Sequence, residues 1–218
     1  MIRLEKGQNS VINLTKFSIG LGWDVSEDNG TGSEFDLDVS AFMLTKSKKL
    51  LSDDYLVFYN SEKRVRPSDL SKIVDASEWG GDNERLRHES RPISPDRSVI
   101  GSLDDENGAT SDDGDDETLD IDLSLVDPKI EEIIICVSIY DYQTRHQNFG
   151  QVERAYVRIY KPGQGEGEGE YIYDLTEDFS TCASVEFCRL YRHSGEWKVQ
   201  AVGKGYKEGF EYLVNKYI

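Results

Sequence analysis

The stretch FDLDVSAF, residues 35–42, alternates apolar side chains (Phe35, Leu37, Val39, Ala41) with polar ones until Phe42. A period of two is that of a β-strand with one buried face. Residues 132–140 read EIIICVSIY, an apolar run typical of a strand that is covered on both faces. These two stretches predict a protein built on β-sheets.

Similar short strands are expected along the rest of the chain, at residues 11–14, 17–23, 55–59, 119–123, 155–160, 170–175, 184–191 and 197–202. The glycine-rich residues 163–169 and the turn at residues 193–196 would each close a hairpin. Phe210, Leu213, Val214 and Tyr217 follow the spacing i, i+3, i+4, i+7, which predicts an amphipathic C-terminal helix. The pattern predicts an all-β fold, a sandwich of two mainly antiparallel sheets with short peripheral helices.

The net charge of −17 is concentrated in one segment. Residues 103–123 carry ten Asp and Glu and no Lys or Arg, and without them the net charge would be −7. Together with the Arg-, Ser- and Pro-rich residues 84–97, this polar region is expected to be a loop or a disordered insertion. We therefore expect one domain over residues 1–218, with a polar, partly disordered insertion at about residues 61–113.

Composition excludes several function classes. Proteins bind nucleic acid and anionic lipid mainly through clustered Lys and Arg. The acidic composition of this chain therefore argues against both functions. No apolar stretch reaches the roughly 20 residues of a membrane-spanning helix, and the N-terminus has no apolar signal sequence, so we expect a cytoplasmic protein. The three cysteines show no zinc or redox spacing and are expected to be buried thiols. The three histidines are expected at the surface.

Carboxylates at strand ends are the candidate functional groups. Asp24 ends one strand, Asp36 and Asp38 share one face of the next, and acids also gather at residues 112–117 and 174–178. Ca²⁺ accepts six to eight oxygen ligands from flexible loops, which suits carboxylates from distant segments. The sequence is not an EF-hand, because Ala41 stands where that loop needs glycine. The alternative is a set of solvated loop acids that bind nothing.

Eight motifs, in order, resemble the tellurium-resistance TerD family. They are GLGWD (20–24), FDLDVSAF (35–42), FYN (58–60), GDN (81–83), GDDE (114–117), QNFGQV (147–152), YDLTED (173–178) and LYRHSGEWK (190–198). The resemblance covers nearly all of residues 1–60 and 114–218. It implies a C2-like β-sandwich that binds one or two Ca²⁺ ions in acidic loops, has no enzymatic activity and serves in resistance to tellurite and other stresses.

The resemblance also implies the ligands and the partner. The implied calcium ligands are Asp24, Asp36, Asp38, Asp82, Asn83, Asp115, Asp116 and Glu117, with Asp174, Glu177 and Asp178 as candidates from the later loop. The implied partner is a membrane-associated protein of the TerC type, and we expect a monomer that neither inserts into the membrane nor binds nucleic acid directly. The chain departs from the family between Asn83 and Gly114, where 30 residues replace a short Thr-Gly-rich loop.

Two other functions stay open at the level of sequence. The chain could bind a small molecule such as a cyclic nucleotide, since the family includes a slime-mould cyclic-AMP-binding relative. It could also be an acidic scaffold whose insertion recruits a basic protein partner. Titration with cyclic nucleotides, with and without calcium, would test the first of these functions. Deletion of the insertion would test the second.

Overall fold

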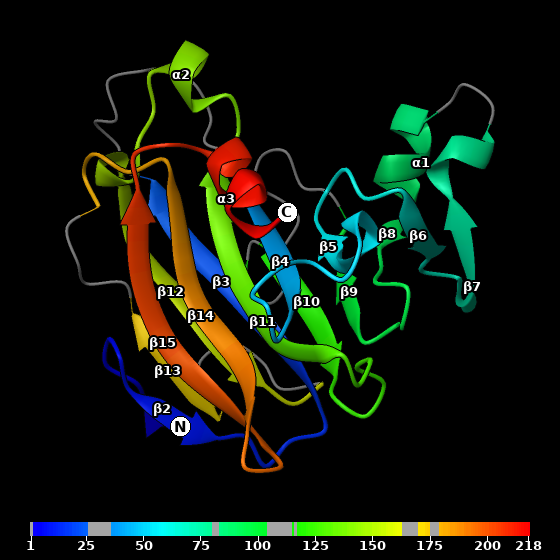
Figure 1. Cartoon of the computed structure of the whole chain (residues 1–218). Coiled ribbons are helices and arrows are strands. Elements are labelled where there is room, and N and C mark those ends of the chain that lie inside the picture. Colours follow the sequence, from blue (N-terminus) through cyan, green and yellow to red (C-terminus); the bar gives the residue numbers. More distant parts are fainter. Residues whose placement is uncertain are drawn as a thin grey trace.

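The computed structural model describes residues 2–25, 36–79, 83–103, 115, 117–162, 170–174 and 179–218. Within them, two six-stranded sheets face each other (Figure 1). The first sheet has the spatial order β1 (Ile2–Arg3), β13 (Tyr171–Asp174), β12 (Val152–Tyr160), β3 (Lys16–Val25), β10 (Glu117–Asp122) and β9 (Val99–Gly101). The second has the order β2 (Asn9–Val11), β15 (Glu196–Tyr206), β14 (Ser184–His193), β11 (Ile130–Ile139), β4 (Leu37–Thr45) and β5 (Leu56–Val57).

The predicted β-sandwich is confirmed. Among the strand pairs described, only β1 and β13 run parallel. The alternation predicted for residues 35–42 continues through β4, where Leu37, Val39 and Ala41 enter the core between the sheets. Strand β11 lies between β4 and β14, and most of its side chains are buried on both faces, as its apolar run indicated.

The outer face of the second sheet is covered by α3 (Phe210–Tyr217). Leu213 and Tyr217 of this helix pack against Phe42 of β4 and Cys136 of β11 in a second, smaller core. The predicted amphipathic C-terminal helix is thus present and buries its apolar side. In the described part of the chain, no helix is both long and apolar enough to cross a bilayer.

A third, small sheet stands beside the sandwich (Figure 1) and consists of β7 (Asp69–Asp75), β6 (Lys63–Arg66) and β8 (Arg91–Pro92). The short helix η2 (Ala76–Trp79) contacts β7 of this sheet and α1 (Asn83–Glu89), whereas η1 (Asp53–Tyr55) contacts β4 of the sandwich. The expectation of a loop or disorder over residues 84–97 is wrong for α1 and β8. Leu86 of α1 and Ile93, directly after β8, are both fully buried. Residues 104–114 lie outside the described residues.

Candidate metal centre

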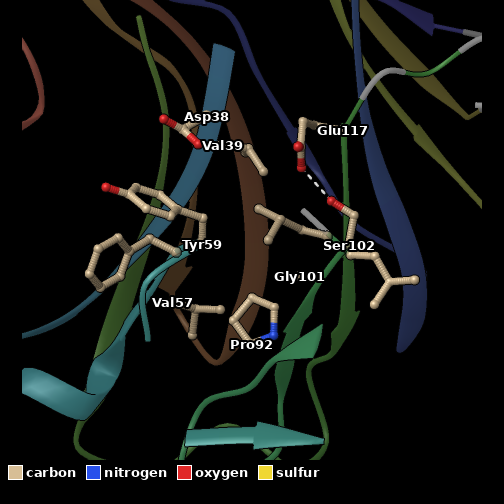
Figure 2. A pocket seen from close by; sticks show the side chains of 11 residues that line it. Asp38, Val39, Val57, Tyr59, Pro92, Gly101, Ser102 and Glu117 are labelled. Atoms are coloured by element: carbon tan, nitrogen blue, oxygen red, sulfur yellow. Dashed lines mark hydrogen bonds between the residues drawn. The ribbon is translucent and has the colours of Figure 1, made fainter. Parts of the chain in front are cut away.

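A small pocket opens between the two sheets, at the edge where β4 and β5 meet β9 and β10 (Figure 2). Two of the predicted calcium ligands line it, Asp38 from β4 and Glu117 from β10. Its cavity volume for a water-sized sphere is about 10 Å³, which is room for about one such sphere. The pocket therefore has the size of a single ion or water molecule. The Glu117 carboxylate faces it from the first sheet. The Asp38 side chain points away from it, to the outer face of the second sheet, because Leu37 and Val39 take the inward-facing positions of β4 (Figure 2).

Glu117 owes its position to the alternation of β10. It precedes Leu119 and Ile121 at steps of two, so all three side chains point to the inner face of the first sheet. Glu117 is 8% exposed as a residue, and its Oε2 accepts a hydrogen bond from the Ser102 hydroxyl, drawn in Figure 2. A carboxylate at the mouth of an apolar core is costly unless it has polar partners or a cation.

Asp115, two residues earlier, is bound on the outer face of the same sheet. Its Oδ1 accepts a hydrogen bond of 2.7 Å from Arg158 Nε, and its Oδ2 accepts one of 2.8 Å from Arg158 Nη2. The Tyr156 hydroxyl donates a further bond of 3.2 Å to Oδ1. The side chains of Asp115 and Arg158 are 1% and 2% exposed. This two-pronged, buried ion pair fixes the chain immediately before Glu117.

Gly20 on β3 makes room for this ion pair. A Cβ atom built on Gly20 would lie 1.9 Å from Asp115 Oδ2, so any larger residue would displace the carboxylate. The Arg158 guanidinium also lies 4.3 Å from the ring centre of Tyr160. Burial, followed by the charge of Asp115, raises the pKa of Tyr160. Burial alone would lower the pKa of Arg158, but the bond and charge of Asp115 raise it, so the guanidinium stays protonated.

The other predicted ligands do not join this pocket in the described residues. Asp36 lies 3.9 Å from Arg145 Nη2, and Asp174 forms an ion pair with Arg3. Asp82, Asp116, Glu177 and Asp178 lie outside the described residues, and only the backbones of Asp24 and Asn83 are described. Within the described ranges, no three His, Cys, Asp or Glu side chains are grouped so that they could hold a metal ion.

Sequence reasoning missed Arg158 and Ser102. Arg158 occupies a predicted strand between Val157 and Ile159, and an arginine inside such a strand is a signal for a buried partner. Ser102 carried no signal, because its role depends on β9 lying beside β10. Cys136 and Cys188 are buried as expected, whereas Cys182 is partly exposed. All three histidines are exposed, as expected.

Comparison with known proteins places these features in a family. A family model described as the TerD domain matches residues 1–217. General stress protein 16U of Bacillus subtilis (strain 168) is 36% identical, covering 99% of this chain and 96% of that protein. Tellurium resistance protein TerD of Serratia marcescens is 35% identical, with the same two coverages.

Solved structures show the same fold. A crystal structure of a homologue of the telluride resistance protein TerD from Streptomyces coelicolor A3(2) has a TM-score of 0.59 at 15% identity. The match covers 93% of this chain and 96% of that one. A crystal structure of a protein of unknown function, SAV2460, has a TM-score of 0.63 at 17% identity, with 95% and 99% covered. Both likenesses concern the fold alone.

Proposed function

Because the chain belongs to the TerD domain family, we propose that it is a calcium-binding, non-enzymatic module of the stress response, including resistance to tellurium compounds. Full-length relatives named for general stress and for tellurium resistance support the biological role. The observation that carries the calcium part is the buried Glu117 carboxylate at a pocket of the size of one ion.

The chemistry of this pocket fits a hard cation. Carboxylate and hydroxyl oxygens are the donors that Ca²⁺ takes, and Glu117 and Ser102 offer both kinds. A buried carboxylate is costly without a compensating charge, which bound Ca²⁺ would supply. Glu117 would then be one ligand of the ion, and loop acids nearby would complete the ligand set.

We assign two different roles among the predicted ligands. Asp115 is paired with Arg158, so its part in the proposed site is to hold the start of β10 in place. Glu117, two residues later, points into the pocket. The proposal further includes a protein partner of the membrane-associated TerC type, which the family resemblance implies. It also includes the cytoplasmic location and the monomeric state that are expected from the sequence.

Thermal unfolding with and without Ca²⁺ tests the proposed site. A ligand at 100 times its Kd stabilises a protein by about 2.7 kcal/mol, which for about 200 residues corresponds to roughly 5–10 °C in Tm. We expect this rise for the unaltered protein after removal of bound metal by a chelator. Glu117→Gln keeps the shape and the bond to Ser102 but removes the charge, and should lose most of the rise.

Glu62→Gln is the matched control, because Glu62 is exposed and does not line the pocket. It should retain the full calcium-dependent rise in Tm. An equal rise in the Glu117→Gln variant would overturn the assignment of the pocket.

A further inference from the structure

A second, larger cavity lies on the outer face of the second sheet, beside the start of α3, and has a volume of about 580 Å³. Aromatic side chains form much of its lining, namely Tyr59, Tyr140, Tyr142, Phe210 and Tyr212. The rings of Tyr59 and Tyr140 meet edge to face with their centres 6.1 Å apart. Tyr140 is 44% exposed, so part of this aromatic surface faces solvent. We call this cavity the tyrosine groove.

The tyrosine groove is shaped by a glycine. A Cβ atom on Gly209, just before α3, would lie 2.7 Å from the Tyr142 ring. Tyr142 belongs to α2 (Tyr142–Arg145), which follows β11, whereas Gly209 precedes the C-terminal helix. Tyr142 and Gly209 thus lie against each other in the lining of the tyrosine groove. The groove is therefore built from elements that are far apart in the sequence.

Carboxylates flank the rings from two directions. Asp38 and Asp141 lie on the side of β4 and β11, and Glu208 and Glu211 lie on the side of α3. No Lys or Arg belongs to the described lining. Outside it, the Arg145 guanidinium lies 5.4 Å from the centre of the Tyr140 ring, so this ring already receives a cation from the protein itself. Aromatic faces attract cations, and desolvation strengthens the attraction.

From this arrangement we propose that the tyrosine groove binds an extended organic polycation of the polyamine class. Its alkyl segments would lie on the tyrosine rings, and its ammonium groups would face the carboxylates at the two sides. A single metal ion fits less well, because in the described part of the chain no three acidic, His or Cys side chains converge on one point. The volume lies within the range of about 300–1,000 Å³ that is usual for ligand pockets.

The test is calorimetric titration of the full chain with spermidine in the presence of a calcium chelator, at about physiological ionic strength. We expect saturable binding of one spermidine per chain. Tyr140→Phe keeps an aromatic face and should bind as the parent does. Tyr140→Leu removes that face and should bind about three- to fivefold more weakly. Thermal melting of both variants checks that they fold.

Charge needs its own control, because a chain with a net charge of −17 attracts any polycation. The double variant Asp141→Asn, Glu211→Gln removes two charges from the tyrosine groove and should weaken binding by about tenfold or more. Asn also tolerates the left-handed backbone of Asp141, whose φ is 47°. Asp104→Asn with Asp105→Asn removes two charges from the acidic segment and should leave the affinity unchanged.

Two results would overturn the proposal. Equal weakening by both double variants, with no effect of Tyr140→Leu, would mean that spermidine only accumulates around a negative surface. An arginine-rich peptide that binds at least tenfold more tightly than spermidine, with the same sensitivity to substitution, would assign the tyrosine groove to a protein partner. Because the titration excludes calcium, either result leaves the proposed calcium function standing.

Discussion

The Arg158–Asp115 ion pair shows that a motif can identify an important residue without identifying its partner. Asp115 belongs to the motif GDDE and was predicted as a calcium ligand from it. The structure shows both of its carboxylate oxygens held by an arginine 43 positions later in the chain. Periodicity places Arg158 on the outer face of β12, but only the pairing of β12 with β3 and of β3 with β10 brings it to Asp115.

Gly20→Ala should disturb this pair directly. The added methyl group would meet the Asp115 carboxylate at its present position, so the carboxylate would have to leave Arg158. Breaking a buried ion pair typically costs about 3–5 kcal/mol. Urea unfolding should therefore show a free energy of unfolding lower by about that amount, together with weaker calcium binding because Glu117 is displaced. A variant with unchanged stability would contradict the close packing over Gly20.

The cysteines give a second prediction at this scale. Burial raises the pKa of Cys188 to about 12 and that of Cys136 well above its ordinary value. Thiolates react with disulfide reagents and thiols do not, so these two side chains should be inert in the folded protein. A disulfide reagent that releases a coloured product should react with Cys182 alone in the native protein at neutral pH. In denaturant it should react with all three thiols. Rapid reaction of three thiols in the native protein would contradict the described core.

At the scale of elements, prediction succeeded where the pattern was long. The alternation in β4, the apolar run of β11 and the spacing in α3 each indicated both the type of element and its buried face. The third sheet was missed because β6 and β8 have only four and two residues and because β7, the longest of its strands, is rich in charged and polar residues. Arg64 of β6 is fully buried and donates hydrogen bonds to Tyr59 O (2.7 Å) and Ser90 O (2.7 Å). Because a buried arginine that donates its hydrogen bonds to backbone carbonyls is a polar residue, the pattern of apolar residues in the sequence does not reveal that this strand is buried.

The third sheet should respond to acid through Asp75, at the end of β7. Hydrogen bonds from Lys63 and then from Ser77 lower the pKa of Asp75 from 3.8 to about 2. A carboxyl with a lowered pKa in the folded state adds stability above its unfolded pKa, and this stability is lost as pH falls. The contribution of Asp75 should therefore disappear between about pH 4 and pH 2.

Asp75→Asn should remove this part of the acid response. Urea midpoints measured at steps from pH 5 to about pH 2 should fall less steeply for the variant than for the parent. Parallel curves would show that the Lys63–Asp75 contact contributes nothing in solution, as many exposed ion pairs do.

At the scale of the whole molecule, the motifs indicated the family, and the family model matches residues 1–217. Asp38 and Glu117 were both named from their motifs. In the structure, Glu117 points between the sheets, whereas β4 turns Asp38 to the outer face of the second sheet. Which acids come together depends on how the two sheets pack, and no local pattern contains that. The sequence placed Asp36 and Asp174 among the same ligands, but the structure pairs them with Arg145 and Arg3. The sequence thus indicated which residues are charged groups of the site region, but not which residue each of them pairs with in the fold.

A calorimetric titration of the metal-free protein with Ca²⁺, repeated with Mg²⁺, tests the central claim most directly. The account predicts one or two sites with a Kd of about 10⁻⁷ to 10⁻⁵ M for Ca²⁺. It also predicts much weaker binding of Mg²⁺, which demands stricter octahedral geometry and keeps its own waters. No heat of binding at millimolar Ca²⁺, or equally weak binding of both ions, would contradict the claim that this protein is a calcium-binding module.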